Sequence, residues 1–593
     1  MRHIWSSLLS SAVLCAASAG PQTIDPPRLK LYESGHVVSR IIVPDHPSAM
    51  ESLAVRTVQD TLRTVWKFEL PAIAVGSGPE LHNAIVIGTP ASNSILGKSS
   101  AALNPELNKI GEQGFLIERQ KQSGATYLVL ASSTPVGVFR GAQYLADFAI
   151  QSQGAEVFAL AQTVTQKPAI ATRGTYNLAC WGLTPRYSLQ DWEKIIDAMA
   201  ADGMNVIYFW VSGLFRSKLY PETFIYPETQ LTTENIRQLI HYANSHGVDF
   251  YLGTGVFAWF GVDEIAKHHD EVRELGIDHM CRTLPAAQKA MQAYLTELYD
   301  TFPEAKGMWL EIGCEGDYHC TGPLCQRKID DYGSRQIGKS ELSFLKRFSN
   351  DLWQQHPEAK LVWGVGYPEA HQWDVNYYDE IRRDFRDPRY RFLEVRQNWE
   401  LPDAQGVLHP LTYVSQNMMH WDQYYALPLR DLGEHAQRIH EDGLSGWIVA
   451  FEPGFSTHSI YGGKIPYPVD AIPYRLTRFA YQQFTSNPGL SWSGFQKRLL
   501  DHFFGEGANP ELVDLTLTVF DLIRTGPIQG AYNELITPVD GMAYGRMLKP
   551  RLAAIEARLN ILESQMPARG RNIGLPLLRR AIQDTRGAYS IER

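Results

Sequence analysis

One segment decides the fold: Gly307-Met308-Trp309-Leu310-Glu311-Ile312-Gly313-Cys314-Glu315-Gly316-Asp317. It begins with a short, mostly apolar run that predicts a buried strand over residues 307–312. Three carboxylates, Glu311, Glu315 and Asp317, follow within seven residues as that strand ends. Closely placed carboxylates repel one another as anions, which raises the pKa of one of them. The segment therefore predicts a buried strand and, at its end, a carboxyl group that keeps its proton near neutral pH.

The alternation of strand and helix extends over residues 171–486. Apolar residues recur with helical spacing between most of the expected strands, and Ser188-Leu189-Gln190-Asp191 resembles a capping box that opens one helix. About 300 residues of alternating strands and helices are the signature of a (β/α)8 TIM barrel. The expected strands are Thr175–Trp181, Asn205–Val211, Asp249–Gly253, Gly307–Ile312, Lys360–Gly366, Arg391–Val395, Leu411–Gln416 and Gly446–Phe451.

The barrel pattern is flanked by two further regions in this chain of 593 residues. Residues 20–170 predict a small α/β N-terminal domain with the order β-α-β-β-β-α, which includes a buried strand at Ala84-Ile85-Val86-Ile87-Gly88. Residues 487–593 predict a helical C-terminal region, with amphipathic helices around Phe495–Leu500 and over later apolar stretches. The expected fold class is thus α/β, with a TIM barrel between a small α/β domain and a group of helices.

Residues 1–19 have the pattern of a signal peptide. Met1-Arg2-His3 is a short basic start, Ile4 to Ala16 is mostly apolar or small, and Ala17-Ser18-Ala19 fits a small-x-small cleavage site. The apolar run is shorter than the roughly 20 residues that cross a bilayer, which argues against a membrane anchor. We expect a secreted or periplasmic protein without a membrane span.

The composition excludes several classes of protein. Hydrophobic residues make up 44% of the chain and charged residues 20%, which indicates a globular protein and not a disordered one. The net charge is −9 and no run of five or more basic residues occurs, so a nucleic-acid partner is not expected. Cys314, Cys320 and Cys325 with His319 fit no common zinc pattern. In an exported protein a disulfide between two of these cysteines is favoured, while free thiols and a metal site remain alternatives.

The barrel indicates where a site would lie, since TIM-barrel active sites form at the carboxyl ends of the strands. Aromatic, amide and carboxylate side chains follow nearly every expected strand. Aromatic rings stack on the apolar faces of sugars, and carboxylates and amides bind sugar hydroxyls. Glycoside cleavage needs two carboxyl groups, one to protonate the leaving oxygen and one to activate water or attack the anomeric carbon. This pattern predicts a glycoside hydrolase that cleaves an oligosaccharide or polysaccharide and needs no cofactor.

The chain resembles exported glycoside hydrolases in which a hexosaminidase-type α/β domain precedes the barrel. The strand Ile85–Gly88 and the run Gly137-Val138-Phe139-Arg140-Gly141-Ala142-Gln143-Tyr144-Leu145 carry this likeness. Cys314-Glu315-Gly316, with Gly322-Pro323 further on, is similar to the strand-four run of family 67 α-glucuronidases. Family 20 β-N-acetylhexosaminidases have Gly-Gly-Asp-Glu there, whereas this chain has Gly313-Cys314-Glu315-Gly316 and lacks the Asp-Glu pair. Family 89 α-N-acetylglucosaminidases share the layout. The cysteine-rich loop also resembles endo-β-N-acetylglucosaminidases of gut bacteria.

The resemblance implies roles for individual residues. The α-glucuronidase match implies that Glu315 is the general acid, with Asp317 and Glu311 tuning it or holding the sugar. Arg173-Gly174 resembles the hexosaminidase barrel start, where the arginine binds sugar hydroxyls. The second carboxylate is expected across the barrel mouth at Glu452, which follows the last strand, with Glu369, Glu394 and Asp422 as further choices. The residues expected to line the sugar site are Arg173, Asn177, Trp181, Trp210, Trp259, Tyr367, Glu369, Trp399 and Trp421.

An α-glucuronidase-like hydrolase is therefore the main prediction. The first alternative is a β-N-acetylhexosaminidase or endo-β-N-acetylglucosaminidase. A non-catalytic glycan-binding protein that keeps the aromatic platform is the second. The third is a metal-dependent lyase or hydrolase that uses His319, His371 and His458.

Overall fold

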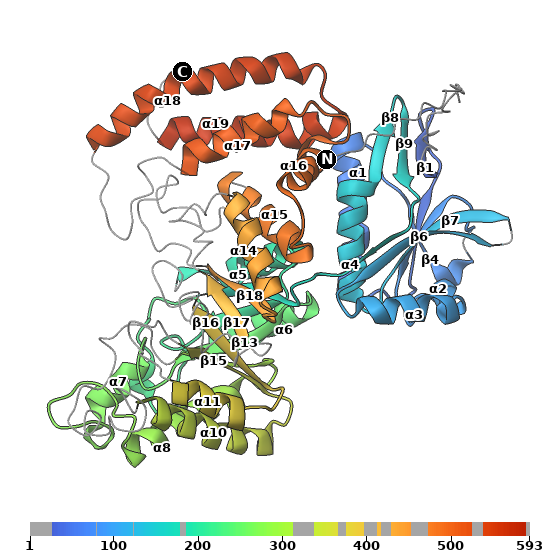
Figure 1. The fold of residues 1–593 in the computed structure, drawn as a ribbon. Helices are drawn as coiled ribbons and strands as arrows, with labels where there is room; N and C mark the ends of the chain where they lie inside the picture. Colours follow the sequence, from blue (N-terminus) through green and yellow to red (C-terminus); the bar gives the residue numbers. More distant parts are fainter. Residues whose placement is uncertain are drawn as a thin grey trace, which may run out of the picture.

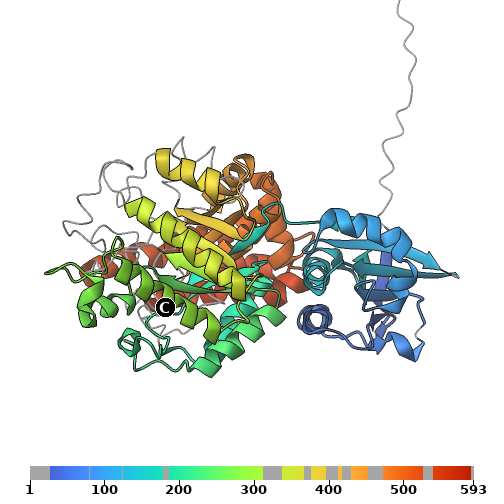
Figure 2. The same cartoon turned by 90° about the horizontal axis from the view of Figure 1, so that it is seen from below.

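The structure is a computed structural model, and three parts follow one another along the chain in it (Figure 1). It describes residues 27–78, 80–122, 124–177, 186–311, 337–365, 375–395, 412–416, 429–451, 472–524 and 538–588. An N-terminal α/β part lies beside a central barrel, and helices near the C-terminus pack against both. The view from below shows the N-terminal part on one side of the barrel (Figure 2).

The central part is a closed barrel of parallel strands, as the sequence predicts. The first strand begins at Thr172 and not at Thr175, because Thr172 and Arg173 already pair with Gly446 and Trp447 of the last strand. The strands are β11 (Thr172–Asn177), β12 (Val206–Trp210), β13 (Asp249–Gly255), β14 (Gly307–Glu311), β15 (Lys360–Val365), β16 (Tyr390–Val395), β17 (Thr412–Gln416) and β18 (Gly446–Phe451).

Helices cover the outside of the barrel. The predicted capping box is present: the Ser188 hydroxyl accepts from the Asp191 backbone, and the Asp191 carboxylate accepts from the Ser188 backbone. The helix that it opens buries Trp192, Ile195 and Met199 against the strands. The covering helices are α5 (Leu189–Ala201), α6 (Thr233–Ser245), α7 (Val262–His268), α8 (Pro285–Thr301), α10 (Ile337–Gln355), α11 (Val375–Asp384), α14 (Leu429–Glu441) and α15 (Ile472–Ser486).

The N-terminal part contains a six-stranded and a four-stranded sheet, with strand orders β10-β6-β7-β5-β3-β4 and β2-β1-β9-β8. The predicted strand Ala84–Gly88 is β5, buried along its whole length. Several strands were not expected from the sequence. Ala72–Ala74 and Val164–Gln166 are too short to show a period, whereas Arg28–Glu33 alternates polar and apolar residues and offered a signal. The elements are β1 (Arg28–Glu33), β2 (His36–Val37), β3 (Arg40–Val43), α1 (Ala49–Trp66), β4 (Ala72–Ala74), β5 (Ala84–Gly88), α2 (Ser94–Lys98), α3 (Ser100–Ile110), β6 (Phe115–Gln122), β7 (Ala125–Ala131), α4 (Pro135–Tyr144), β8 (Ile150–Gln153), β9 (Glu156–Leu160) and β10 (Val164–Gln166).

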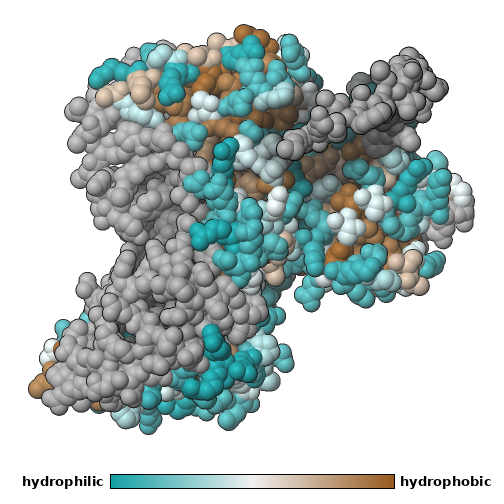
Figure 3. All heavy atoms as spheres, viewed as in Figure 1, coloured by the Kyte–Doolittle hydropathy of each residue, from teal (hydrophilic) through white to brown (hydrophobic). Residues whose placement is uncertain are grey.

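The C-terminal part consists of helices α16 (Trp492–Phe504), α17 (Glu511–Arg524), α18 (Pro538–Glu563) and α19 (Leu575–Ala588). Between α18 and α19, Arg569 reaches the N-terminal part, where it donates to the Ala146 carbonyl at 2.7 Å and to Asp147 Oδ1 at 2.9 Å. Apolar side chains gather at the surface over these helices (Figure 3). Within the described ranges, no helix is long and apolar enough to cross a membrane.

Candidate active site

Aromatic side chains fill the barrel interior beneath its carboxyl end. The Trp309 ring lies 5.5 Å from Tyr176, 5.9 Å from Tyr208 and 5.2 Å from Trp210, measured between ring centroids. Trp210 has no exposed surface, although the sequence predicted that it would stack on a sugar. As the last residue of β12 it is enclosed by Trp309 and by aromatic residues that follow β13. Its place is therefore in the barrel core, where it supports the site from below.

The backbone that follows β13 is strained. Phe257, Trp259 and Phe260 have positive φ angles of 67°, 80° and 40°, a region that bulky residues rarely adopt. The Trp259 N–H donates to Asp263 Oδ1 at 2.6 Å, which holds this turn in place. Strain of this kind persists where the surroundings impose it, and it clusters at ligand sites. Trp259 is only partly buried and sits 5.8 Å from Trp210, so it stays a candidate to contact a sugar.

Glu311 is the carboxylate that the described residues place at the barrel mouth. It is the last residue of β14 and pairs with Gly364 of β15. A Cβ atom at position 364 would lie 2.1 Å from Glu311 Oε2, so this glycine provides the space that the carboxyl group occupies. Burial raises the pKa of Glu311 to about 8; the Trp309 side chain opposes this shift and the charge of Glu341 adds to it. Glu311 is therefore protonated at neutral pH, as a general acid must be.

Behind this strand end lies a buried ion pair that sequence reasoning missed. Glu341 of α10 and Arg282, which precedes α8, are 0% and 1% exposed and form a direct salt bridge. Burial raises the pKa of Glu341 to about 7, while Arg282 opposes that shift. A signal was present in the sequence, because Glu341 shares the helix face of Leu345 and Phe348. A glutamate on an apolar face needs a partner or a proton.

Arg173 lies away from the mouth, near the amino end of β11. Its guanidinium donates to the Gly203 carbonyl at 2.9 Å, to the Ile170 carbonyl at 2.7 Å and to the side chain of Gln113. It is 2% exposed. These contacts face the N-terminal part, so the placement does not suit the predicted role of a sugar ligand at the carboxyl end. The resemblance suggested that role and the strand pattern did not, because Arg173 also precedes the expected strand Thr175–Trp181 and lies at the amino end in either case.

The remaining predicted site residues fall in segments that the structure does not describe. Only the backbone of Asn177 is described, at the carboxyl end of β11 between Phe209 and Phe451. The same holds for Glu394, within β16. Outside the described residues lie Glu315, Asp317, Glu452, Trp181, Tyr367, Glu369, Trp399, Trp421, Asp422, His319, His371, His458 and the three cysteines of the strand-four loop.

Comparisons with solved structures relate this architecture to enzymes that act on glycans. A GH138 enzyme targeting pectin rhamnogalacturonan II aligns with 93% of this chain and 69% of its own, at 11% identity and a TM-score of 0.54. The fold of the chain resembles that of this glycoside hydrolase. A β-N-acetylhexosaminidase from Bacteroides fragilis aligns with 80% of this chain and 92% of its own, at 14% identity and a TM-score of 0.53. A GH20 exo-β-N-acetylglucosaminidase from Vibrio harveyi aligns with 82% of this chain and 74% of its own, at 14% identity and a TM-score of 0.51.

These likenesses concern the fold, which combines an N-terminal α/β part with a parallel barrel. They support the hexosaminidase-type alternative better than the family 67 α-glucuronidase interpretation. No protein-family model matches the sequence, and no curated protein matches it either.

Proposed function

We propose that the protein is an exported glycosidase of the hexosaminidase type, which hydrolyses a glycan at the carboxyl end of its barrel. The observation that carries this proposal is the position of Glu311. A carboxyl group that keeps its proton at neutral pH ends strand four, above an aromatic core and beside the strained turn at Trp259. The fold likeness to hexosaminidases and to a pectin-targeting enzyme supports the same class. Export rests on the signal-peptide pattern of residues 1–19.

The chemistry follows from the protonation state. The neutral Glu311 carboxyl donates its proton to the glycosidic oxygen as the bond to the anomeric carbon breaks, and a water completes the hydrolysis. Desolvation keeps the proton on the carboxyl until the leaving oxygen gains negative charge and accepts it. Trp259 offers a partly exposed ring for the apolar face of the sugar. Glu315 remains the other proposed acid and Glu452 the proposed second carboxylate.

Two variants identify the acid. The purified protein, Glu311→Gln and Glu315→Gln are assayed on N-acetylhexosaminides and glucuronides that carry either a poor leaving group, 4-methoxyphenol, or a good one, 2,4-dinitrophenol. A variant without its general acid loses cleavage of the poor leaving group and retains much of its activity on the good one, because a stable phenolate needs no proton. We expect this split for Glu311→Gln.

Equal losses on both substrates in Glu311→Gln, with the split in Glu315→Gln, would move the acid to Glu315. If the wild-type protein cleaves none of these substrates and no hexosamine- or uronate-bearing oligosaccharide, the glycosidase proposal fails. Glycan-array binding would then test the non-catalytic alternative.

A further inference from the structure

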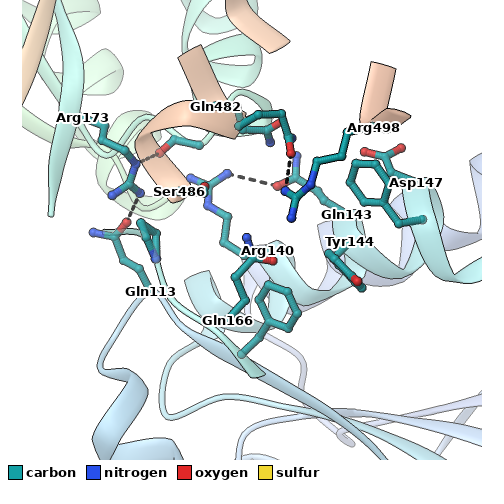
Figure 4. Close-up of a pocket in the computed structure, with 15 residues that line it drawn as sticks. Gln113, Arg140, Gln143, Tyr144, Asp147, Gln166, Arg173, Gln482, Ser486 and Arg498 are labelled. Carbon is teal, nitrogen blue, oxygen red and sulfur yellow. Dashed lines mark hydrogen bonds between the residues drawn. The ribbon is translucent and has the colours of Figure 1, made fainter. Parts of the chain in front are cut away.

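A cavity lies between the N-terminal part and the barrel, at the end opposite the candidate active site (Figure 4). Its volume is about 60 Å³. A single water needs roughly 10–15 Å³ of cavity, so the space suits several waters or one small ion and is too small for a sugar ring. Its walls come from α4, β11, α15 and α16. These elements are far apart in the sequence.

Three arginines line this cavity: Arg140 of α4, Arg173 of β11 and Arg498 of α16. Arg140 and Arg173 are 8% and 2% exposed, and Arg498 is partly buried. The Figure 4 view shows their guanidinium groups reaching toward the same region from different elements. Like charges repel most strongly where water is excluded. Burial, with the charge of Arg173 adding to it, lowers the pKa of Arg140 to about 9, and burial lowers that of Arg173 to about 10.

Backbone carbonyls and glutamine side chains, which carry no charge, accept hydrogen bonds from these arginines. Arg140 Nη1 donates to the Ala200 carbonyl and to Gln143 Oε1, and its Nη2 donates to the Met204 carbonyl at 3.3 Å. Arg498 Nη1 donates to Gln483 Oε1 at 2.7 Å. The buried Arg140 Nε has no hydrogen-bond acceptor in the described structure. These contacts supply dipoles and no negative charge.

The nearby carboxylates are engaged elsewhere. Asp147, the acid in the cavity wall, pairs with Arg569 at 2.9 Å and with His502 at 3.3 Å. Asp202 pairs with Arg478 at 2.6 Å. Within the described part of the chain, none of the three cavity arginines has a carboxylate within ion-pair distance. Burying a cation without a counter-charge is costly, and an anion bound between them would offset that cost.

We propose that this cavity binds a tetrahedral oxyanion, phosphate or sulfate, held by Arg140, Arg173 and Arg498 between the N-terminal part and the barrel. Guanidinium groups match such oxygens with paired, charge-assisted hydrogen bonds. Because the three arginines come from different parts of the chain, the ion ties those parts together. This site is separate from the proposed glycosidase site and does not depend on it.

Calorimetric titration and thermal unfolding of the purified protein test the site, with inorganic phosphate or sulfate in one arm and chloride at equal ionic strength in the other. We expect binding of one ion per chain and a Tm that rises with phosphate concentration, since a ligand of the native state stabilises it by mass action. Arg498→Gln, at a partly exposed position, should weaken binding at least tenfold. Arg140→Lys keeps the positive charge but loses the paired N–H donors of the guanidinium group, so it should weaken phosphate binding as well. Sulfate should compete with phosphate for the same site, because the arginines only donate hydrogen bonds and both ions offer acceptor oxygens. Binding of phosphate alone would contradict this, since it would mean that the site recognises a protonated oxygen.

Arg119→Gln is the matched control, because Arg119 is an exposed arginine of the N-terminal part that does not line the cavity. Its affinity for phosphate should equal that of the unchanged protein. The proposal is overturned if neither oxyanion binds above the chloride background, or if Arg498→Gln and Arg140→Lys, both folded by circular dichroism, bind phosphate as the unchanged protein does.

Discussion

The two ends of the barrel hold ionisable side chains in different ways. At the carboxyl end, Glu311 occupies the space that Gly364 leaves, has a pKa of about 8 and lies near a strained turn. At the amino end, Arg173 donates to backbone carbonyls and to Gln113, and its contacts join the barrel to the N-terminal part. The carboxyl end thus keeps a protonated carboxyl group in a setting that disfavours its ionised form, and the amino end uses a charged group for assembly. This division matches the separation of catalysis and stability in TIM barrels.

Glu311→Gln tests the carboxyl end with the largest expected effect. Replacing the carboxyl group by an amide removes the proton donor and leaves the side-chain volume nearly unchanged. Turnover of substrates with poor leaving groups should therefore fall about 10²–10⁴-fold. The free energy of unfolding at pH 7 should rise, because the amide removes the cost of protonating the carboxyl group on folding. Initial rates and urea titrations measure the two quantities. Glu506→Gln, at an exposed position of the C-terminal part, is the control and should alter neither.

Arg173→Met tests the amino end and should show the reverse pattern. The substitution leaves several buried carbonyl groups without a donor, and each such group costs about 1–3 kcal/mol. We expect a loss of about 3 kcal/mol in the free energy of unfolding, with turnover at 25 °C retained. A loss of turnover without a loss of stability would return Arg173 to the substrate site that the hexosaminidase resemblance implied.

Gly364→Ala tests the space beside Glu311. The new Cβ would lie 2.1 Å from Glu311 Oε2, so the carboxyl group must move. A displacement of about 1 Å in a catalytic group can cost on the order of 10²-fold in rate, and we expect a decrease of at least tenfold in kcat. Gly489→Ala serves for comparison, because its Cβ would come no closer than 3.7 Å to a neighbouring side chain.

The pH dependence of rate and stability provides a smaller, graded test. The protonated acid is required, so the rate should fall as pH rises through about 8, by about tenfold at one unit above the pKa. The folded pKa exceeds the ordinary value of 4.5. The protonated carboxyl therefore contributes stability below pH 4.5 that is progressively lost as pH rises to about 8. Glu311→Gln should remove both dependences, and unchanged profiles would assign the ionisation to another group.

Ser188→Ala should have the smallest effect on stability and helps to compare the two ends of the barrel. The residue caps α5, and losing its hydroxyl leaves an N–H of the first helical turn without an acceptor. The cost should be about 1 kcal/mol in the free energy of unfolding, measured by urea titration. A cost as large as that of Arg173→Met would mean that stability is not concentrated at the amino end.

The barrel could be predicted because short, mostly apolar runs such as Val206–Trp210 alternate with stretches in which apolar residues recur at helical spacing. Several bounds agree to the residue, as for Gly446–Phe451. The short strands of the N-terminal part, such as His36–Val37, carry too few residues for any periodicity to show. Helix α19 was also not expected individually, although its region was predicted to be helical.

The candidate site was only partly accessible from sequence. Glu311 could be found because it ends a recognisable strand. The partnership of Arg282 and Glu341 could not, because 59 residues separate the two side chains and only the folded barrel brings them together. Arg173 was expected in the sugar site from the hexosaminidase resemblance and Trp210 from its place at a strand end, and neither signal reveals what surrounds a side chain. Strand register and neighbouring rings decide which of these residues contact solvent.

The contact of Arg569 with Asp147 has a consequence for how the protein is made. The two residues are 422 positions apart, so a ribosome that adds about 5–20 residues per second reaches the arginine roughly 20–80 s after the aspartate. During that interval the N-terminal part has emerged without its partner on the C-terminal segment. A nascent chain stopped before residue 569 would lack the Arg569 donors to the Ala146 carbonyl and to Asp147, although His502 could still pair with Asp147. Synthesis of the segment that contains Arg569 is thus required before this contact between the two parts can form.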